Sequence, residues 1–125
     1  MNIEDLRDYC LSLKAVEEKM PWTEPQYNML VTFSVGGKWF CLLDTVKKFI
    51  DVKSDPEKIQ AILAHYKGAF PAWHMKKEHW IGITLNSDVP DSLIKELLEE
   101  GYKSVVHHLP KKTMDIVFGS AKEDV

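Results

Sequence analysis

The chain contains little of what marks specialised classes of protein. Two cysteines in 125 residues, Cys10 and Cys41, are too few for a disulfide scaffold, and no Cys-x-x-Cys or Cys/His spacing indicates a metal site. No apolar run approaches the roughly 18 residues of a membrane helix. The N-terminus also lacks the basic and then apolar regions of a signal peptide. These absences predict a cytoplasmic protein with buried free thiols and no membrane partner.

Positive charge is scarce as well. The chain has 16 lysines and arginines and 19 aspartates and glutamates, which gives a formal charge of −3. Arg7 is the single arginine. Non-specific binding to nucleic acid is driven by positive side chains that neutralise phosphates. Sequence-specific recognition of guanine most often uses arginine. Any nucleic-acid role must therefore depend on a local patch, such as the basic groups at Lys47-Lys48, Lys76-Lys77 or residues 103–112.

Common catalytic motifs are absent too. The chain has no G-x-S-x-G, no P-loop, no H-E-x-x-H and no dinucleotide fingerprint. Its one Gly-Gly pair, Gly36-Gly37, is explained by a turn. We therefore expect no enzymatic activity and no cofactor.

What the chain does contain is a clear succession of helix and strand signals. Apolar residues at helical spacing predict helices over residues 3–13, from Pro56 to Gly68, and from Pro90 to Pro110. Two β-rich runs, 29–35 and 38–43, flank the Gly-Gly pair and predict a hairpin. Further strands are expected over 46–52 and, as a second hairpin, over 73–75 and 79–85. This order predicts an α+β fold with a mainly antiparallel sheet of about five strands.

The densest chemistry lies in residues 71–80, Pro-Ala-Trp-His-Met-Lys-Lys-Glu-His-Trp. Two tryptophans, two histidines and two lysines within ten residues suit contact with an anion or a flat ring. A purely structural interpretation remains open, in which Lys76-Lys77 is a solvated turn and the two tryptophans belong to the core. Metal binding is not expected, because the five-residue spacing of His74 and His79 is not a standard ligand pattern.

Four motifs occur in this order along the chain: Val35-Gly-Gly-Lys-Trp-Phe40, Asp55-Pro-Glu-Lys58, the segment 71–80, and Gly101-Tyr-Lys-Ser-Val-Val-His-His-Leu-Pro-Lys111. Together they resemble the MmcQ/YjbR family of small bacterial proteins, over about residues 1–112. The family's usual central motif is close to Pro-Gly-Tyr-His-Met-Asn-Lys-x-His-Trp, from which Ala72, Trp73 and Lys76 depart. The resemblance implies one frataxin-like (CyaY-like) domain over 1–112, with helices packed on one face of the sheet. Residues 113–125 would be a tail, with 115–118 as a possible short edge strand.

The resemblance also implies a "double wing" in which two hairpins contact DNA. The residues expected at such a nucleic-acid site are Lys38, His74, Lys76, Lys77 and His79. The alternative is a small-ligand or protein-interaction module that uses segment 71–80 as a pocket wall. Its expected lining is Trp73, His74, His79 and Trp80.

Overall fold

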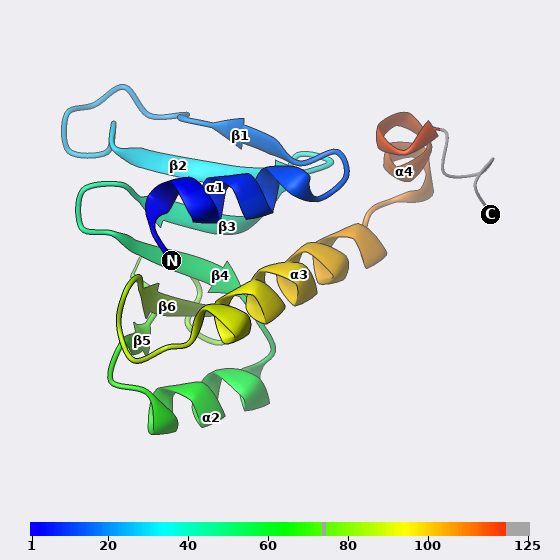
Figure 1. The fold of residues 1–125 in the computed structure, drawn as a ribbon. Helices are drawn as coiled ribbons and strands as arrows, with labels where there is room; N and C mark the ends of the chain where they lie inside the picture. Colours follow the sequence, from blue (N-terminus) through cyan, green and yellow to red (C-terminus); the bar gives the residue numbers. More distant parts are fainter. Residues whose placement is uncertain (74, 120–125) are drawn as a thin grey trace.

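A computed structural model describes residues 1–73 and 75–119 of the chain (Figure 1). His74, which both predicted sites include, lies outside the described residues. In chain order the elements are α1 (Ile3–Ser12), β1 (Glu17–Lys19), β2 (Leu30–Val35), β3 (Lys38–Asp44), β4 (Phe49–Lys53), α2 (Pro56–His65), β5 (Ala69–Pro71), β6 (Trp80–Thr84), α3 (Asp91–His107) and α4 (Lys111–Val117). The strands form one antiparallel sheet in the order β1-β2-β3-β4-β6-β5. The α+β prediction is confirmed, with six strands where about five were expected.

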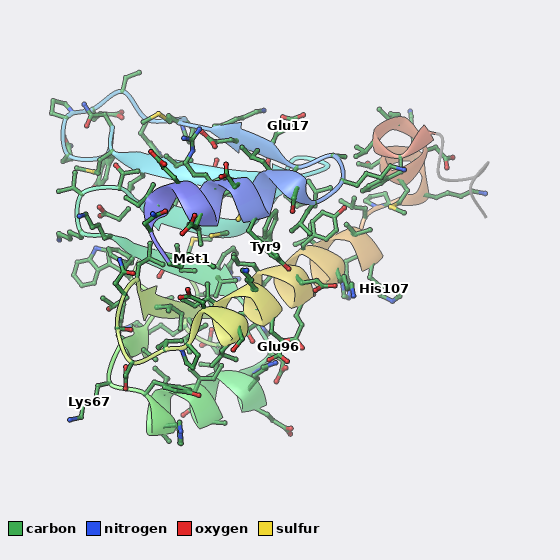
Figure 2. All side chains as sticks on the ribbon, viewed as in Figure 1. Met1, Tyr9, Glu17, Lys67, Glu96 and His107 are labelled. Atoms are coloured by element: carbon green, nitrogen blue, oxygen red, sulfur yellow. The ribbon has the colours of Figure 1, made fainter. Side chains whose placement is uncertain are left out.

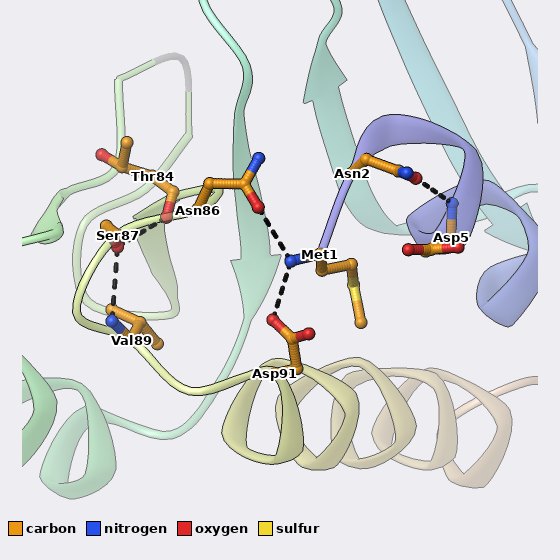
Figure 3. Close-up of polar contacts among 8 residues, drawn as sticks. All are labelled: Met1, Asn2, Asp5, Thr84, Asn86, Ser87, Val89 and Asp91. Atoms are coloured by element: carbon orange, nitrogen blue, oxygen red, sulfur yellow. Dashed lines mark hydrogen bonds and ion pairs between the residues drawn. The ribbon is translucent and has the colours of Figure 1, made fainter.

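Side-chain caps explain where the first two helices begin. The Asn2 side chain accepts a hydrogen bond of 2.7 Å from the Asp5 N–H, and the Asp55 side chain accepts one of 2.9 Å from the Lys58 N–H. The residue before the Asn2 cap, Met1, also contacts the loop before α3 and the first residue of α3. There the Met1 amino group lies 3.0 Å from Asn86 Oδ1 and 2.9 Å from an Asp91 carboxylate oxygen (Figure 3).

The sheet has two faces of different character. Helices α1 and α3 lie across one face, and α2 lies beside β5 (Figure 1). We call this side the helix-covered face; its strand residues are nearly all aliphatic or aromatic and belong to one buried cluster. Residues that alternate onto the other side include Leu30, Leu42 and Trp80. Side chains from the segments 20–29 and 72–79 lie against it, so we call it the loop-covered face.

The Gly36-Gly37 turn behaves as predicted, with φ of 59° and 78°, and joins β2 to β3. Other boundaries differ from the predictions. Residues 46–48 form a turn, in which Lys48 has φ of 59°, and β4 begins only at Phe49. The pairing of residues 73–75 with β6 is wrong, because the partner of β6 is β5, and Trp73 and Met75 lie in the following loop.

The C-terminal prediction also needs correction. Residues 115–118 do not form an edge strand, because Lys111–Val117 is the helix α4. Phe118 is buried in the same cluster as α1 and α3, with Met114 packed against that cluster. Burial of these two side chains therefore outweighs the strand-like run Ile116-Val117-Phe118.

Candidate functional site

A cleft of about 980 Å³ opens where one end of the sheet meets the beginning of α2 and the last turns of α3. We call it the basic cleft, because most of its charged or protonatable side chains are cationic types. These cationic types are Lys53, Lys76, His79, Lys103, His107 and His108, and the acids are Asp55 and Glu100. The cationic types come from β4, from α3 with its C-cap His108, and from the segment 72–79, so only the folded chain assembles them.

Backbone pairing holds the sheet side of the cleft. Lys53, the last residue of β4, lies opposite Trp80, the first residue of β6. The Ser54 N–H then donates to the His79 carbonyl at 2.9 Å, and the His79 N–H donates to the Lys76 carbonyl at 3.1 Å. This turn fixes the backbone of Lys76 and His79 beside the end of β4.

The helix side depends on a close approach of α3 to the sheet. A Cβ on Gly101 would lie 2.9 Å from the backbone oxygen of Lys53, so only glycine fits there without a shift. Lys103 and His107 follow on the same helix within two turns. Figure 2 shows Glu96 and His107 projecting from the side of α3 that is turned toward α2.

Both acids of the cleft already have cationic or backbone partners. The Asp55 carboxylate caps α2, and Glu100 accepts a hydrogen bond of 2.6 Å from Lys58 Nζ, which also lies 2.9 Å from Glu96. Partial burial lowers the pKa of Lys58, but its hydrogen bonds to these two glutamates outweigh burial and raise that pKa overall. The ammonium of Lys58 therefore offsets part of the negative charge of Glu96 and Glu100 beside the cleft.

The lysine and histidines on α3 have defined surroundings. Lys103 Nζ lies 2.8 Å from Glu99, and this hydrogen bond and the carboxylate charge raise the pKa of Lys103, which keeps it cationic. His108 Nδ1 lies 2.7 Å from the Ser104 carbonyl oxygen. Since a carbonyl only accepts, Nδ1 carries the proton. The arrangement as a whole suits an anion with more than one charged group.

The structure divides the residues predicted from the sequence. Lys76, His79 and Trp80 line the basic cleft, while Lys77 is exposed but does not line it. Trp73 borders a separate hollow of about 190 Å³ with Phe49 and Phe70, and it is 70% exposed, whereas Trp80 is 8% exposed. The two tryptophans therefore do not share one pocket wall.

Lys38, the first residue of β3, lies at the same end of the sheet as Lys53, because β3 and β4 are antiparallel neighbours. The site predicted from the sequence does not include Lys53. Lys103 is named only among the basic groups of residues 103–112, and His107 and His108 are weighed as metal ligands but not as part of a nucleic-acid site. The histidine pair did carry a signal, since it belongs to the fourth motif of the resemblance. Lys53 carried none.

A second hollow, of about 240 Å³, lies on the loop-covered face. We call it the aromatic groove; its lining is Trp22, Tyr27, Leu30, Trp39, Leu42 and Met75. The rings of Trp22 and Trp39 meet edge to face, with centroids 5.5 Å apart and planes at 74°. Trp39 is 36% exposed and Tyr27 41%, so parts of both rings remain accessible.

Within residues 1–73 and 75–119, no group of three or more His, Cys, Asp or Glu side chains is placed to hold a metal ion. In the same described part of the chain, no helix has both the length and the apolar character needed to cross a membrane.

Comparison with known proteins places the chain in a family. The uncharacterized protein YbdF of Escherichia coli O157:H7 is 31% identical over 111 residues, covering 87% of this chain and 88% of that protein. A crystal structure of the Deinococcus radiodurans protein DR2400, with the domain DUF419, superposes with a TM-score of 0.80 at 27% identity, covering 93% of this chain and 87% of the other. The uncharacterized protein YjbR of Escherichia coli strain K12 is 25% identical over 90% of this chain and 93% of its own length. The family model described as YjbR matches residues 11–104, and the chain therefore belongs to the YjbR family.

Proposed function

We propose that this YjbR-family protein is a cytoplasmic, non-enzymatic protein that binds DNA through the basic cleft, with Lys38 at the same end of the sheet. The observation that carries the proposal is the convergence of three lysines and three histidines on one cleft. Asp55 caps α2, Glu100 is paired with Lys58 and Glu99 with Lys103, so these carboxylates already have partners, and Lys53 and Lys76 are the cleft lysines outside these pairs.

The size and composition of the cleft support a polyanion. Phosphates on a backbone are bound by ammonium and imidazole groups spread along a surface, and this binding weakens as salt rises. The six side chains come from three stretches of chain and line a volume of about 980 Å³, which exceeds what one phosphate needs. Several neighbouring phosphates fit this spread better.

A phosphorylated small molecule is the second candidate. The cleft volume lies at the upper end of the range of small-ligand pockets, and Lys76, His79 and Trp80 of the segment 71–80 line it. This candidate predicts saturable binding of pyrophosphate or a mononucleotide by calorimetry. The DNA proposal predicts that an oligonucleotide binds far more tightly than either.

The test uses fluorescence anisotropy with a labelled oligonucleotide, single-stranded and as its duplex, at several salt concentrations. We expect Lys53→Ala with Lys76→Ala to weaken binding to the single strand about tenfold or more at low salt. Loss of two phosphate contacts also lowers the salt slope by about 1.4 for a single strand.

Two controls accompany this measurement. Lys47→Ala with Lys67→Ala removes the same charge from exposed positions outside the cleft, and Lys77→Ala removes the neighbour of Lys76 that does not line it. Both should leave affinity unchanged. An unchanged affinity and salt slope in the cleft variant would refute DNA binding at this site, as would an equal loss in the charge-matched control.

A further inference from the structure

The aromatic groove and the basic cleft adjoin each other. Met75 lines the groove and the next residue, Lys76, lines the cleft. A second connection runs through the sheet, where Cys41 lies opposite Val52, so the start of β3 runs beside the end of β4. A Cβ on Gly101 would approach the carbonyl oxygens of both Lys53, at 2.9 Å, and Phe40, at 3.6 Å, which places these two backbones side by side.

The chemistry changes across this boundary. The groove offers two tryptophan rings and a tyrosine ring, and the cleft offers ammonium and imidazole groups. Lys76 follows Met75 in the chain, so a lysine stands where the groove meets the cleft. A ligand that carries both a flat apolar ring and a negative charge matches this pairing better than a wholly apolar peptide does.

A single-stranded nucleic acid is such a ligand. Its bases have free faces that stack on aromatic side chains, whereas the bases of a duplex are stacked on one another. The edge-to-face contact of Trp22 with Trp39 supports one ring with the other and leaves the exposed part of Trp39 as a platform.

We propose that the aromatic groove binds a base of single-stranded nucleic acid whose phosphates lie in the basic cleft, and that Trp39 makes the protein prefer single strands to duplex. The proposal rests on the proposed function, because the phosphates need the cleft. It assigns strand preference to Trp39 and general affinity to the lysines.

The experiment compares Trp39→Leu with Trp73→Leu, which is the same change at a more exposed tryptophan bordering a separate hollow. Three probes are titrated: labelled oligothymidylate, a duplex of equal length, and inorganic polyphosphate in competition. We expect Trp39→Leu to lower the affinity for oligothymidylate about tenfold or more. The affinities for the duplex and for polyphosphate should stay within about twofold of those of the unmodified protein. Trp73→Leu should change none of the three.

Trp39→Phe keeps a ring and should restore most of the lost affinity, and thermal unfolding of each variant shows that it is folded. If oligothymidylate binds Trp39→Leu as well as the unmodified protein, the base site is refuted while the proposed function stands. An equal loss for all three probes also refutes it, since the residue then acts on the phosphate site. If no probe binds the unmodified protein, both proposals fail.

Discussion

The two faces of the sheet are built from the same strands but have different contents. On the helix-covered face, aliphatic and aromatic side chains from β2, β3, β4 and β6 meet α1 and α3 in one cluster. Among the described residues, the buried polar or charged side chains all alternate onto the loop-covered face. They are Thr32, Ser34, Asp44 and Asp51. These buried side chains are therefore all apolar on one face, and the other face combines polar and aromatic groups, which is the composition that the proposed binding function needs.

The covering material differs as well. Helices bury a face with regular, densely packed contacts, whereas irregular segments leave hollows between their side chains. The aromatic groove and the end of the basic cleft formed by Lys53 and Trp80 are such hollows on the loop-covered face. We therefore expect substitutions on the helix-covered face to act on stability, and substitutions on the loop-covered face to act more on binding.

The largest expected effect comes from Leu43→Ala, and its neighbour Leu42→Ala is the matched comparison. Both leucines are buried on β3, but Leu43 belongs to the helix-covered cluster and Leu42 borders the aromatic groove. We expect Leu43→Ala to lower the free energy of unfolding by about 3–4 kcal/mol and Leu42→Ala by about 2, because loop segments relax into the space more easily than helices do. Urea denaturation measures both. Equal losses would show that the loop-covered face is packed as rigidly as the other.

A smaller effect is expected from adding one methyl group at Gly101, with Gly82→Ala as its counterpart on the loop-covered face. The new Cβ at 101 meets the Lys53 backbone oxygen at 2.9 Å, which the chain can relieve only by shifting α3. At 82 it meets the ring of Phe70, and a side chain at the sheet edge can rotate away.

The gain in helix propensity, about 1 kcal/mol, offsets part of the strain at 101, so we expect a net loss of about 1–2 kcal/mol there. Gly82→Ala should cost less and should change mainly the environment of Phe70, which NMR of its ring protons would show. Since α3 carries Lys103 and His107, Gly101→Ala should also weaken oligonucleotide binding. If Gly82→Ala lowers the free energy of unfolding more than Gly101→Ala does, the loop-covered face is the more rigid of the two, contrary to our expectation.

Much of the fold could be predicted from local patterns, and the failures have physical causes. The Gly-Gly hairpin and the caps at Asn2 and Asp55 are local signals, and the structure has both. Strand β1 has only three residues, Glu17-Glu18-Lys19, which show no apolar alternation, so it is defined by pairing with β2 alone. Helix α4 lies where the sequence predicts a tail with a possible short edge strand, because local propensity does not include the burial of Phe118.

The candidate site was only partly accessible to sequence reasoning. Residues 76–80 contain three of its side chains, Lys76, His79 and Trp80, within five positions, which makes that segment stand out in the sequence. Lys53 and His107 are far apart in the chain and meet because α3 crosses the end of β4 at Gly101. That contact depends on the packing of the whole domain, and no local pattern in the sequence encodes it.

The smallest predicted effect concerns Asp88, in the loop that joins the sheet to α3 and so belongs to neither face. Its carboxylate accepts hydrogen bonds of 2.7 Å from the N–H groups of both Lys67 and Gly68. These two bonds, that of Lys67 first, hold the pKa of Asp88 below its ordinary value. A depressed pKa in the folded state means that Asp88 contributes stability above the unfolded-state pKa of about 4, and that this is lost as pH falls through the folded-state pKa.

We therefore expect Asp88→Asn to lower the Tm at neutral pH, by less than either leucine substitution does. The difference in Tm from the unmodified protein should begin to narrow below about pH 4 and continue to narrow as pH falls through the depressed folded-state pKa, where the native carboxyl becomes protonated and resembles the amide in charge. Thermal unfolding followed by circular dichroism from pH 7 to about pH 3 measures this. A difference that stays constant with pH would assign the effect to shape and not to charge, and one that widens on acidification would contradict the direction of the pKa shift. Because the loop lies away from both the cleft and the groove, any oligonucleotide affinity should not change, which would separate this stabilising contact from the proposed binding site.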